Sequence, residues 1–545
     1  MLDLRLIWQK AKSDPGWQGR HPFAVSWIVA FLLYATIGHR YGTVPVYWDA
    51  LLTWDAAAEL HKHPWLPFIL QTTDNGHPPF VAWVLSVVWF LPLPGILAIH
   101  LVTWAGAATL LSSVFLIGYL SFGFGVGLAS ALLTAFHPVV AGQSLQLNLD
   151  IFLAAFAFLA LAGAATGRPG MLATGCVSVA MVKLNGIFAL GPFLIWALLG
   201  CVCHGRWRNP RFVFSAFWPM GLTILVFVEY HLAKIFVTGH VFDDTTLEGG
   251  HQLALVSSLA SYFTHVYHST YQMLAANGNI WVVAALLAAT VILPFSLCFP
   301  SCRNEIKGWL ISRNNEDENV RLWQPMRPVS VLVLLWLMLI VQLSFQSLRD
   351  TWTLVRYFMV CYPTLYITLF ALISIIFHRF RALAIAMLAV SLLGIFFLKW
   401  HPSNVGWITP PLREFIIYPS PTTPTNYENN IQFVDQLPLL RATVEYLNKH
   451  YDRGTSISAP WPFDRYLVDP AQGITAFCFN HVSWHQIHKK KPEIILDFSC
   501  GKPRLPSDRK GIPHDYRLVK VFSRGQVWIA LYQKRIQKMD GTLLE

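Results

Sequence analysis

Residues 97–119 read LAIHLVTWAGAATLLSSVFLIGY and contain no aspartate, glutamate, lysine or arginine. A helix of about 20 apolar residues is long enough to cross the hydrocarbon core of a bilayer. Apolar stretches of comparable character recur on both sides of this one, near 23–38, 79–94, 124–143, 151–167, 171–203, 212–236, 277–299, 328–346, 357–377 and 382–400. The 171–203 stretch has room for two short helices. The pattern predicts an α-helical polytopic membrane protein with about eleven transmembrane helices.

The composition of the whole chain agrees with this prediction. Of 545 residues, 54% are hydrophobic and only 13% are charged, about half the charged fraction of an ordinary soluble protein. Forty Lys and Arg against 29 Asp and Glu give a net charge of +11. No basic patch interleaved with stacking aromatics lies outside the apolar stretches, so we expect no nucleic-acid partner.

The basic residues instead indicate topology, because they collect in the cytoplasmic loops of membrane proteins. They cluster before the first apolar stretch and in three later loops, near 206–211, 303–327 and 379–381. Placing all four clusters inside puts the N-terminus in the cytoplasm and everything after about residue 401 outside, across a membrane that we expect to be a bacterial inner membrane. No small-residue cleavage site follows the first stretch, which predicts an uncleaved first span.

The segment between Asp49 and Asp150 is the difficult part of this topology. Three apolar stretches separate the two carboxylates, and three full crossings would put them on opposite faces of the membrane. The 79–94 stretch is short and is bracketed by the prolines of 78–79 and 92–94. We therefore predict that one of the three stretches is a partial span and that both carboxylates face the outside.

The C-terminal part of the chain has a different composition. We predict a transmembrane domain over 1–400, a linker rich in Pro, Thr, Ser and Asn over 401–430, and an extracytoplasmic α/β domain over 431–545. Within that domain the pattern predicts a helix at 436–450 and strands at 455–459, 494–498, 516–522 and 527–532. Cys478 and Cys500 both lie there and could pair in an oxidising compartment.

Ionisable residues at membrane depth or at the ends of spans mark functional sites in membrane proteins. The sequence places such residues after the first apolar stretch, at the starts of three later ones and inside another: Asp49, Asp55, His77, Asp150, Lys183, Arg349 and Arg356, the last followed by Tyr357. Each has a structural alternative. Asp49, Asp55 and Asp150 could cap helices, Lys183 could extend to the interface, Arg356 could anchor a span, and His77 could satisfy loop carbonyls.

The order and spacing of these residues resemble a known family. Asp49 follows the first span, His77-Pro78-Pro79 begins the next apolar stretch, Leu149-Asp150 opens a later one, and Lys183 and Arg356-Tyr357 come further on. This series is similar to that of the membrane glycosyltransferases of the C-type (GT-C) fold, in the branch of the lipid A aminoarabinose transferases and protein O-mannosyltransferases. In this chain Ala50 replaces the glutamate that commonly follows the first acid, and His77 stands where many members have lysine.

The resemblance implies a sugar donor linked to a polyprenyl phosphate, held in the bilayer, and transfer to a lipid, glycan or protein acceptor at the outer face. It implies Asp49 as general base, with Asp55 in reserve and Asp150 as the second catalytic acid. Cations stabilise a leaving phosphate, which points to Lys183, Arg349 and Arg356. Direct displacement would invert the anomeric configuration. A divalent metal ion held by the acids and histidines stays open, as does the alternative of a transporter or flippase for lipid-linked sugars.

Overall fold

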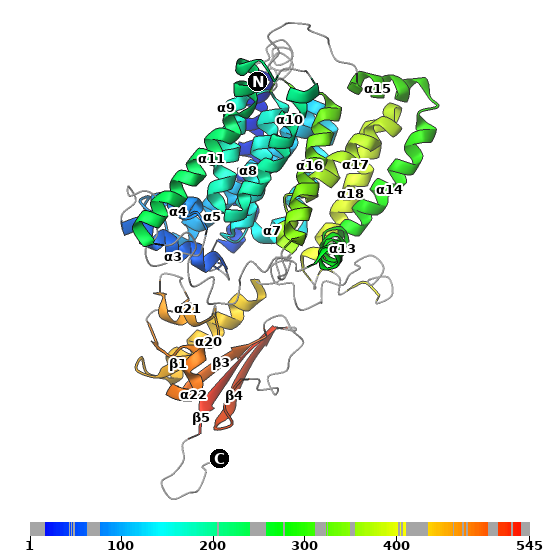
Figure 1. Ribbon diagram of the computed structural model, residues 1–545. Coiled ribbons are helices and arrows are strands. Elements are labelled where there is room, and N and C mark those ends of the chain that lie inside the picture. The colour runs from blue at the N-terminus through cyan, green and yellow to red at the C-terminus, as the bar shows by residue number, and fades with distance from the viewer. Residues whose placement is uncertain are drawn as a thin grey trace, which may run out of the picture.

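The computed structural model describes most of the chain. The described residues are 17–42, 44, 46, 49–62, 77–203, 207–239, 258–275, 278–310, 323, 325–348, 355–401, 404, 407–409, 434–461, 463–470, 474–475, 478–499, 511–524 and 527–535. They form a helical bundle with a small mixed domain at one end of it (Figure 1).

Most of the bundle consists of apolar helices that run along its long axis (Figure 1). Seven described helical segments are long and apolar enough to cross a membrane, and four shorter apolar helices accompany them. The main helices are α2 (Trp17–Gly38), α5 (Gly95–Phe122), α6 (Phe124–Phe136), α8 (Leu149–Ala165), α9 (Pro169–Val182), α10 (Gly191–Cys203), α11 (Pro210–Thr238), α14 (Asn279–Ser296), α16 (Pro328–Ser347), α17 (Tyr362–Ile376) and α18 (Arg381–Trp400). The exact number of crossings stays a prediction.

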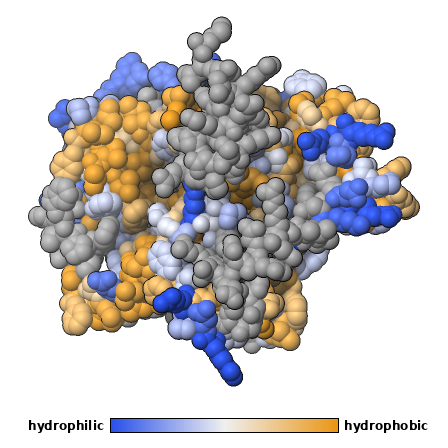
Figure 2. Space-filling view, turned by 90° about the horizontal axis from the view of Figure 1, so that it is seen from above, coloured by the Kyte–Doolittle hydropathy of each residue, from blue (hydrophilic) through white to orange (hydrophobic). Residues whose placement is uncertain are grey.

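The surface of the bundle is apolar as well. Large hydrophobic side chains such as Phe214, Phe236 and Phe295 are more than two-thirds exposed. Figure 2, which looks down on the end opposite the C-terminal domain, shows hydrophobic residues spread around the rim of the bundle. A soluble protein does not expose apolar surface on this scale. The chain is therefore an integral membrane protein.

The chain between the two predicted acids contains one broken span. The 79–94 stretch forms only α4 (Phe80–Val88), nine residues long, or about 14 Å at the usual helical rise. A bilayer core is about 30 Å thick, so α4 cannot cross it. The two helices that follow, α5 and α6, run through the bundle in opposite directions. The short α7 (Pro138–Gln143) then leads to the start of α8.

Glycines allow the helices around α8 to approach closely. A Cβ on Gly163 would lie 2.3 Å from the backbone nitrogen of Leu172, and one on Gly175 would lie 2.4 Å from that of Ala160. The α8–α9 hairpin can therefore pack only with hydrogen at these positions, as is common between membrane helices. This packing fixes the start of α8 relative to the end of α9.

Two helices that the apolar pattern did not predict accompany the bundle. They are α13 (Leu259–Ala275) and α15 (Pro300–Leu310). Both mix polar and apolar residues, with histidines and tyrosines in α13 and charged residues in α15. A search for continuous apolar stretches misses helices of this kind.

The C-terminal domain contains a five-stranded sheet with the order β2-β1-β3-β5-β4. Its strands are β1 (Ser456–Ser458), β2 (Asn480–His481), β3 (Ile494–Phe498), β4 (Tyr516–Arg524) and β5 (Val527–Lys534). β1 pairs in parallel with β2 and β3, whereas β5 is antiparallel to β3 and β4. The predicted helix is α20 (Gln436–His450). The α/β prediction is confirmed, and the elements that it missed are the two-residue β2 and the short helices α21 (Phe463–Val468) and α22 (Ile487–Lys490).

The C-terminal domain also takes residues of the membrane domain into its core. Val44 and Leu145 belong to the same buried cluster as Leu447, Ile457 and Leu531 of the C-terminal domain. Val44 lies five residues before Asp49, and Leu145 lies five residues before Asp150. The two chain segments that carry the candidate acids are thus anchored in the fold of the C-terminal domain.

The predicted pairing of the two C-terminal cysteines stays untested. The Cys478 thiol is exposed and donates a hydrogen bond to the carbonyl of Val468 at 2.9 Å. Cys500 lies outside the described residues.

Candidate functional site

A cluster of buried charges lies where α8 begins. Asp150 stands in the first turn of α8 and is 2% exposed. Its Oδ1 accepts a hydrogen bond from the Lys183 ammonium at 2.8 Å, and its Oδ2 lies 3.1 Å from Nε of Arg356. Both oxygens of this carboxylate therefore face a cation, as burial of a charge within a membrane protein requires.

Lys183 reaches Asp150 because the helical path is interrupted there. α9 ends at Val182, Lys183 adopts an extended conformation, and the 3-10 helix η2 (Leu184–Leu190) follows. A Cβ on Gly186 would lie 1.9 Å from the carbonyl oxygen of Val179. The segment Lys183-Leu-Asn-Gly186 is thus a helix break in which glycine permits the close backbone approach, and the break directs the lysine into the cluster.

Arg356 joins the two acids. It lies in the 3-10 helix η4 (Val355–Phe358) and is 2% exposed. Besides its contact with Asp150, its Nη2 donates a hydrogen bond to Oδ2 of Asp49. The Tyr362 hydroxyl donates to the carbonyl of Val355 at 2.9 Å, which holds the start of η4. The structure therefore brings together Asp49, Asp150, Lys183 and Arg356, as the sequence predicted.

The two acids differ in accessibility. Asp49 is the first residue of helix α3 (Asp49–Lys62), and its side chain is 49% exposed. Asp150 is enclosed, with 2% of its side chain exposed. Only Asp49 can therefore be approached by a bulky acceptor without rearrangement of the cluster.

Tyr357 and His77 complete the surroundings of the cluster. The Lys183 ammonium lies 4.6 Å from the centre of the Tyr357 ring, and the Arg356 guanidinium lies 5.6 Å from it. Cations at such distances from an aromatic ring are attracted by it. His77 lies near enough to Asp150 to interact with it electrostatically. Arg349 lies outside the described residues, so its predicted role stays a prediction.

Asp55 does not join the cluster. It lies six residues after Asp49 on α3, which at about 100° per residue places it on another face of the helix. There it forms an ion pair with Arg465 of the short helix α21 (Phe463–Val468) in the C-terminal domain. Burial raises the pKa of Asp55, with Arg465 acting in the opposite direction. Asp55 is therefore a residue of the domain junction.

Sequence reasoning missed the residues of α21 that hold α3. Next to Arg465, the fully buried Tyr466 donates a hydrogen bond from its hydroxyl to the carbonyl of Val46 at 2.6 Å. Val46 lies 420 positions away in the sequence and three residues before Asp49. No local pattern in a single sequence indicates a contact over this separation.

The described residues do not offer a metal site. No three His, Cys, Asp or Glu side chains come together among them in a way that could hold an ion. Both oxygens of Asp150 already face cations, and Asp49 binds Arg356. The donor set expected of a divalent oxygen site does not fit this cluster, so no chemical step is assigned to a metal.

Comparison with known proteins identifies the fold. No protein-family model matches the chain, and no curated protein matches its sequence. Two solved structures are similar over 93% of this chain and 98% of theirs, each at 13% identity. They are ArnT from Cupriavidus metallidurans in the apo state, with a TM-score of 0.53, and the same protein bound to undecaprenyl phosphate, with a TM-score of 0.51.

These similarities define the class of fold first. The chain has the fold of a membrane protein of the C-type (GT-C) glycosyltransferase architecture, with a C-terminal sheet domain. More particularly, it is similar to ArnT, an aminoarabinose transferase, as the resemblance of the sequence motifs predicted.

Proposed function

We propose that this protein is a glycosyltransferase that moves a sugar from a polyprenyl-phosphate donor to a hydroxyl acceptor at the extracytoplasmic face of a bacterial inner membrane. The observation that carries the proposal is the bridge of Arg356 between an accessible carboxylate, Asp49, and an enclosed one, Asp150. The ArnT fold and the complex of one structural neighbour with undecaprenyl phosphate support the same class of donor.

In the proposed reaction Asp49 is the general base. An acceptor hydroxyl has a high pKa, so its attack on the anomeric carbon is assisted by a carboxylate that takes the proton. Arg356 binds Oδ2 of Asp49, which leaves Oδ1 for the acceptor. The new carbon–oxygen bond forms as the bond from the anomeric carbon to the phosphate oxygen breaks. A single displacement of this kind inverts the anomeric centre.

In the same proposal Lys183 and Arg356 stabilise the leaving group. The lipid phosphate departs with the electron pair of the broken bond, and its growing negative charge is stabilised by cations fixed in advance in a site poor in water. Each cation keeps N–H donors beyond those that face Asp150. Asp150 acts in this proposal as a positioning residue, because its two oxygens hold both cations.

The position of the cluster also favours transfer over the alternative of transport. Transporters commonly place substrate sites near the bilayer midplane between internal repeats. Here the cluster sits at the start of α8 and next to segments anchored in the C-terminal domain. A site at one end of the bundle suits an acceptor that arrives from one side of the membrane.

The test uses the purified full-length protein in nanodiscs with a polyprenyl-phosphate-linked sugar that is radiolabelled in the sugar. Total lipid extract and cell-envelope glycans supply the acceptors. Transfer to any acceptor is expected for the natural chain and for Asp452→Asn, an exposed control in the C-terminal domain. Asp49→Asn should lose transfer by about 10²- to 10⁴-fold while still binding undecaprenyl phosphate. Normal transfer by Asp49→Asn would overturn the assignment of the base.

A further inference from the structure

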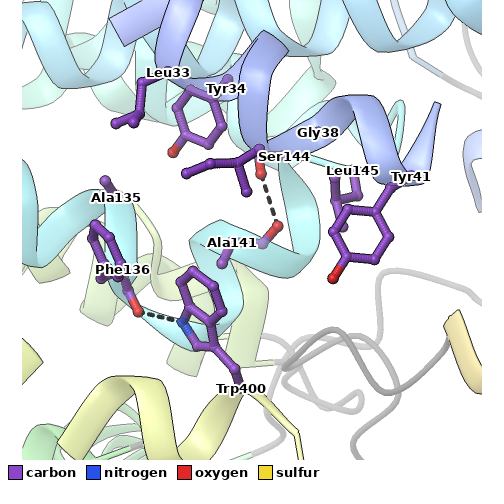
Figure 3. Close-up of a pocket in the computed structure, with 11 residues that line it drawn as sticks. Leu33, Tyr34, Gly38, Tyr41, Ala135, Phe136, Ala141, Ser144, Leu145 and Trp400 are labelled. Atoms are coloured by element: carbon purple, nitrogen blue, oxygen red, sulfur yellow. Dashed lines mark hydrogen bonds between the residues drawn. The ribbon is translucent and has the colours of Figure 1, made fainter. Parts of the chain in front are cut away.

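An apolar cavity lies between helices that do not carry the acid–cation cluster. Its walls come from α2 and α18, and its floor comes from the end of α6 and from α7 (Figure 3). Leu33 and Ile37 of α2 line it and are 37% and 40% exposed on the apolar outer surface. In a membrane these residues face lipid, so the cavity opens sideways to the bilayer.

Few polar groups remain free on the walls of this cavity. The indole nitrogen of Trp400 donates a hydrogen bond to the carbonyl of Phe136 at 2.7 Å, and the Ser144 hydroxyl donates to the carbonyl of Ala141 at 2.7 Å (Figure 3). The Tyr34 hydroxyl is buried without a hydrogen-bond partner among the described residues, and the rest of the lining is mainly hydrocarbon. The cavity holds only about 40 Å³, so its apolar surface suits contact with an acyl chain that lies along it in the bilayer, not enclosure of a whole chain.

Next to the cavity lies a cleft of about 590 Å³ that is lined by charged as well as apolar residues. Ile37, Tyr41 and Trp400 line both. The cleft lies where the end of α2 and the end of α18 meet the C-terminal domain. The two neighbouring hollows make up one stretch of surface, in which the cavity supplies apolar residues and the cleft adds Arg40, Asp435 and Arg524. We call it the junction groove.

The polar end of the junction groove carries excess positive charge. Asp435, just before α20, lies 3.3 Å from Nε of Arg524 and 2.7 Å from Nε2 of His401. This carboxylate compensates one cation. Arg40 also lines the cleft, and within the described part of the chain its guanidinium has no ion-pair partner. Among the residues that the structure describes, the cleft therefore holds one arginine more than it has carboxylates to pair with.

We propose that the junction groove binds an anionic membrane phospholipid, with an acyl chain packed along Leu33 and Ile37 at the opening of the apolar cavity and the headgroup phosphate at Arg40 and Arg524. An arginine fork matches phosphate oxygens, and an acidic lipid supplies the missing negative charge and the hydrocarbon in one molecule. The groove includes none of Asp49, Asp150, Lys183 and Arg356. The proposal therefore stands whether or not the chain transfers sugar.

The test titrates the delipidated full-length protein with dioleoyl phosphatidylglycerol and, separately, dioleoyl phosphatidylcholine, and counts bound lipid by native mass spectrometry. We expect the anionic lipid to bind more tightly, and Arg40→Gln/Arg524→Gln to lose about tenfold or more of that preference. The matched control is Arg208→Gln/Arg379→Gln, which removes two exposed charges outside the junction groove. It should keep the preference.

Two further experiments, a substitution in the cavity and a change of salt concentration, complete the test. Ala141→Leu narrows the apolar cavity and should weaken binding of the anionic lipid without removing a charge. If the double arginine variant fails to fold, raised salt applied to the natural chain tests the same electrostatic contact, because salt screens it. Equal binding of the two lipids would overturn the proposal. One-for-one displacement of the anionic lipid by undecaprenyl phosphate would overturn it too, since the groove would then be the donor site.

Discussion

Arg356 of η4 donates a hydrogen bond to Asp49 of α3, 307 positions earlier in the chain, although Arg356 is buried and Asp49 is half exposed. The same guanidinium lies 3.1 Å from the enclosed Asp150. An arginine can hold two carboxylates at once because its nitrogens form a rigid, planar fork. This bridge connects the accessible acid to the buried one. Because the two acids differ in burial, they should contribute differently to stability and to activity.

Removal of the buried acid should cost stability as well as activity. Asp150→Asn leaves Lys183 and Arg356 buried without their shared counter-charge, and breaking a buried pair in this way typically costs about 3–5 kcal/mol. Asp49→Asn should cost less than about 1 kcal/mol, because half-exposed ion pairs contribute little. Unfolding of both variants in mixed detergent micelles measures the difference. Equal stability of the two variants would contradict the distinct roles.

A lysine at position 356 should not replace the arginine. Arg356→Lys keeps the positive charge, but a single ammonium cannot reach Asp49 and Asp150 with separate nitrogens of a fixed fork. We expect kcat of transfer to fall by about tenfold or more, and Arg356→Gln to fall further because the leaving phosphate loses a cation. Steady-state kinetics with a lipid-linked sugar donor check this order. Natural activity in Arg356→Lys would show that charge alone suffices.

The sequence predicts this cluster because its chemistry is unusual for its surroundings. A lysine inside an apolar stretch and acids beside spans are costly unless they are paired, so Asp49, Asp150, Lys183 and Arg356 stand out as candidates in the sequence alone. The proline-bracketed 79–94 stretch likewise predicted a partial span, and α4 is one. In both cases the sequence departs from an ordinary transmembrane helix, by a charge in an apolar setting or by a short stretch between prolines, and the departure lies in a segment that forms or leads to the site.

What the sequence could not predict depends on long-range contacts. Asp55 resembles Asp49 in sequence setting, yet it faces Arg465, 410 positions later. The helix α13 is missed because its apolar residues cover only one face. Val44 and Leu145 look like ordinary apolar residues, and only the fold shows that they enter the core of the C-terminal domain.

The junction between α3 and the C-terminal domain should respond to pH. Burial raises the pKa of Asp55 and of Asp464, although Arg465 opposes the rise at both. An acid with a raised pKa binds its proton more tightly in the folded chain. The resulting stability is complete below the ordinary aspartate pKa of about 3.9 and is lost as the pH rises through the raised value.

We therefore expect the double substitution Asp55→Asn/Asp464→Asn to make the free energy of unfolding depend less on pH. The free energy of unfolding of the natural chain, minus that of the double variant, should decrease between about pH 4 and pH 7. Unfolding curves across this range measure it. The exposed Asp452→Asn serves as control and should leave the slope unchanged. A difference that grows with pH would mean that the ion pair with Arg465 outweighs the cost of burial.

Tyr466 should matter for catalysis through the backbone that carries Asp49. Its hydroxyl donates to the carbonyl of Val46 at 2.6 Å, and both residues are buried. Tyr466→Phe leaves that carbonyl without this donor, which should cost about 1–3 kcal/mol of stability. Because Val46 lies three residues before Asp49, the loss should also displace Asp49, the proposed base. A displacement of about 1 Å can lower a rate by about 10²-fold.

Tyr516→Phe is the matched control for that loss. The Tyr516 hydroxyl also donates to a backbone carbonyl, that of Pro492 at 2.5 Å, but it does so within the C-terminal domain. Both variants should lower the free energy of unfolding, whereas only Tyr466→Phe should lower kcat while leaving the affinity for undecaprenyl phosphate unchanged. If the two variants lose the same fraction of kcat, the effect comes from general destabilisation of the domain. If neither loses kcat, the C-terminal domain does not position the base.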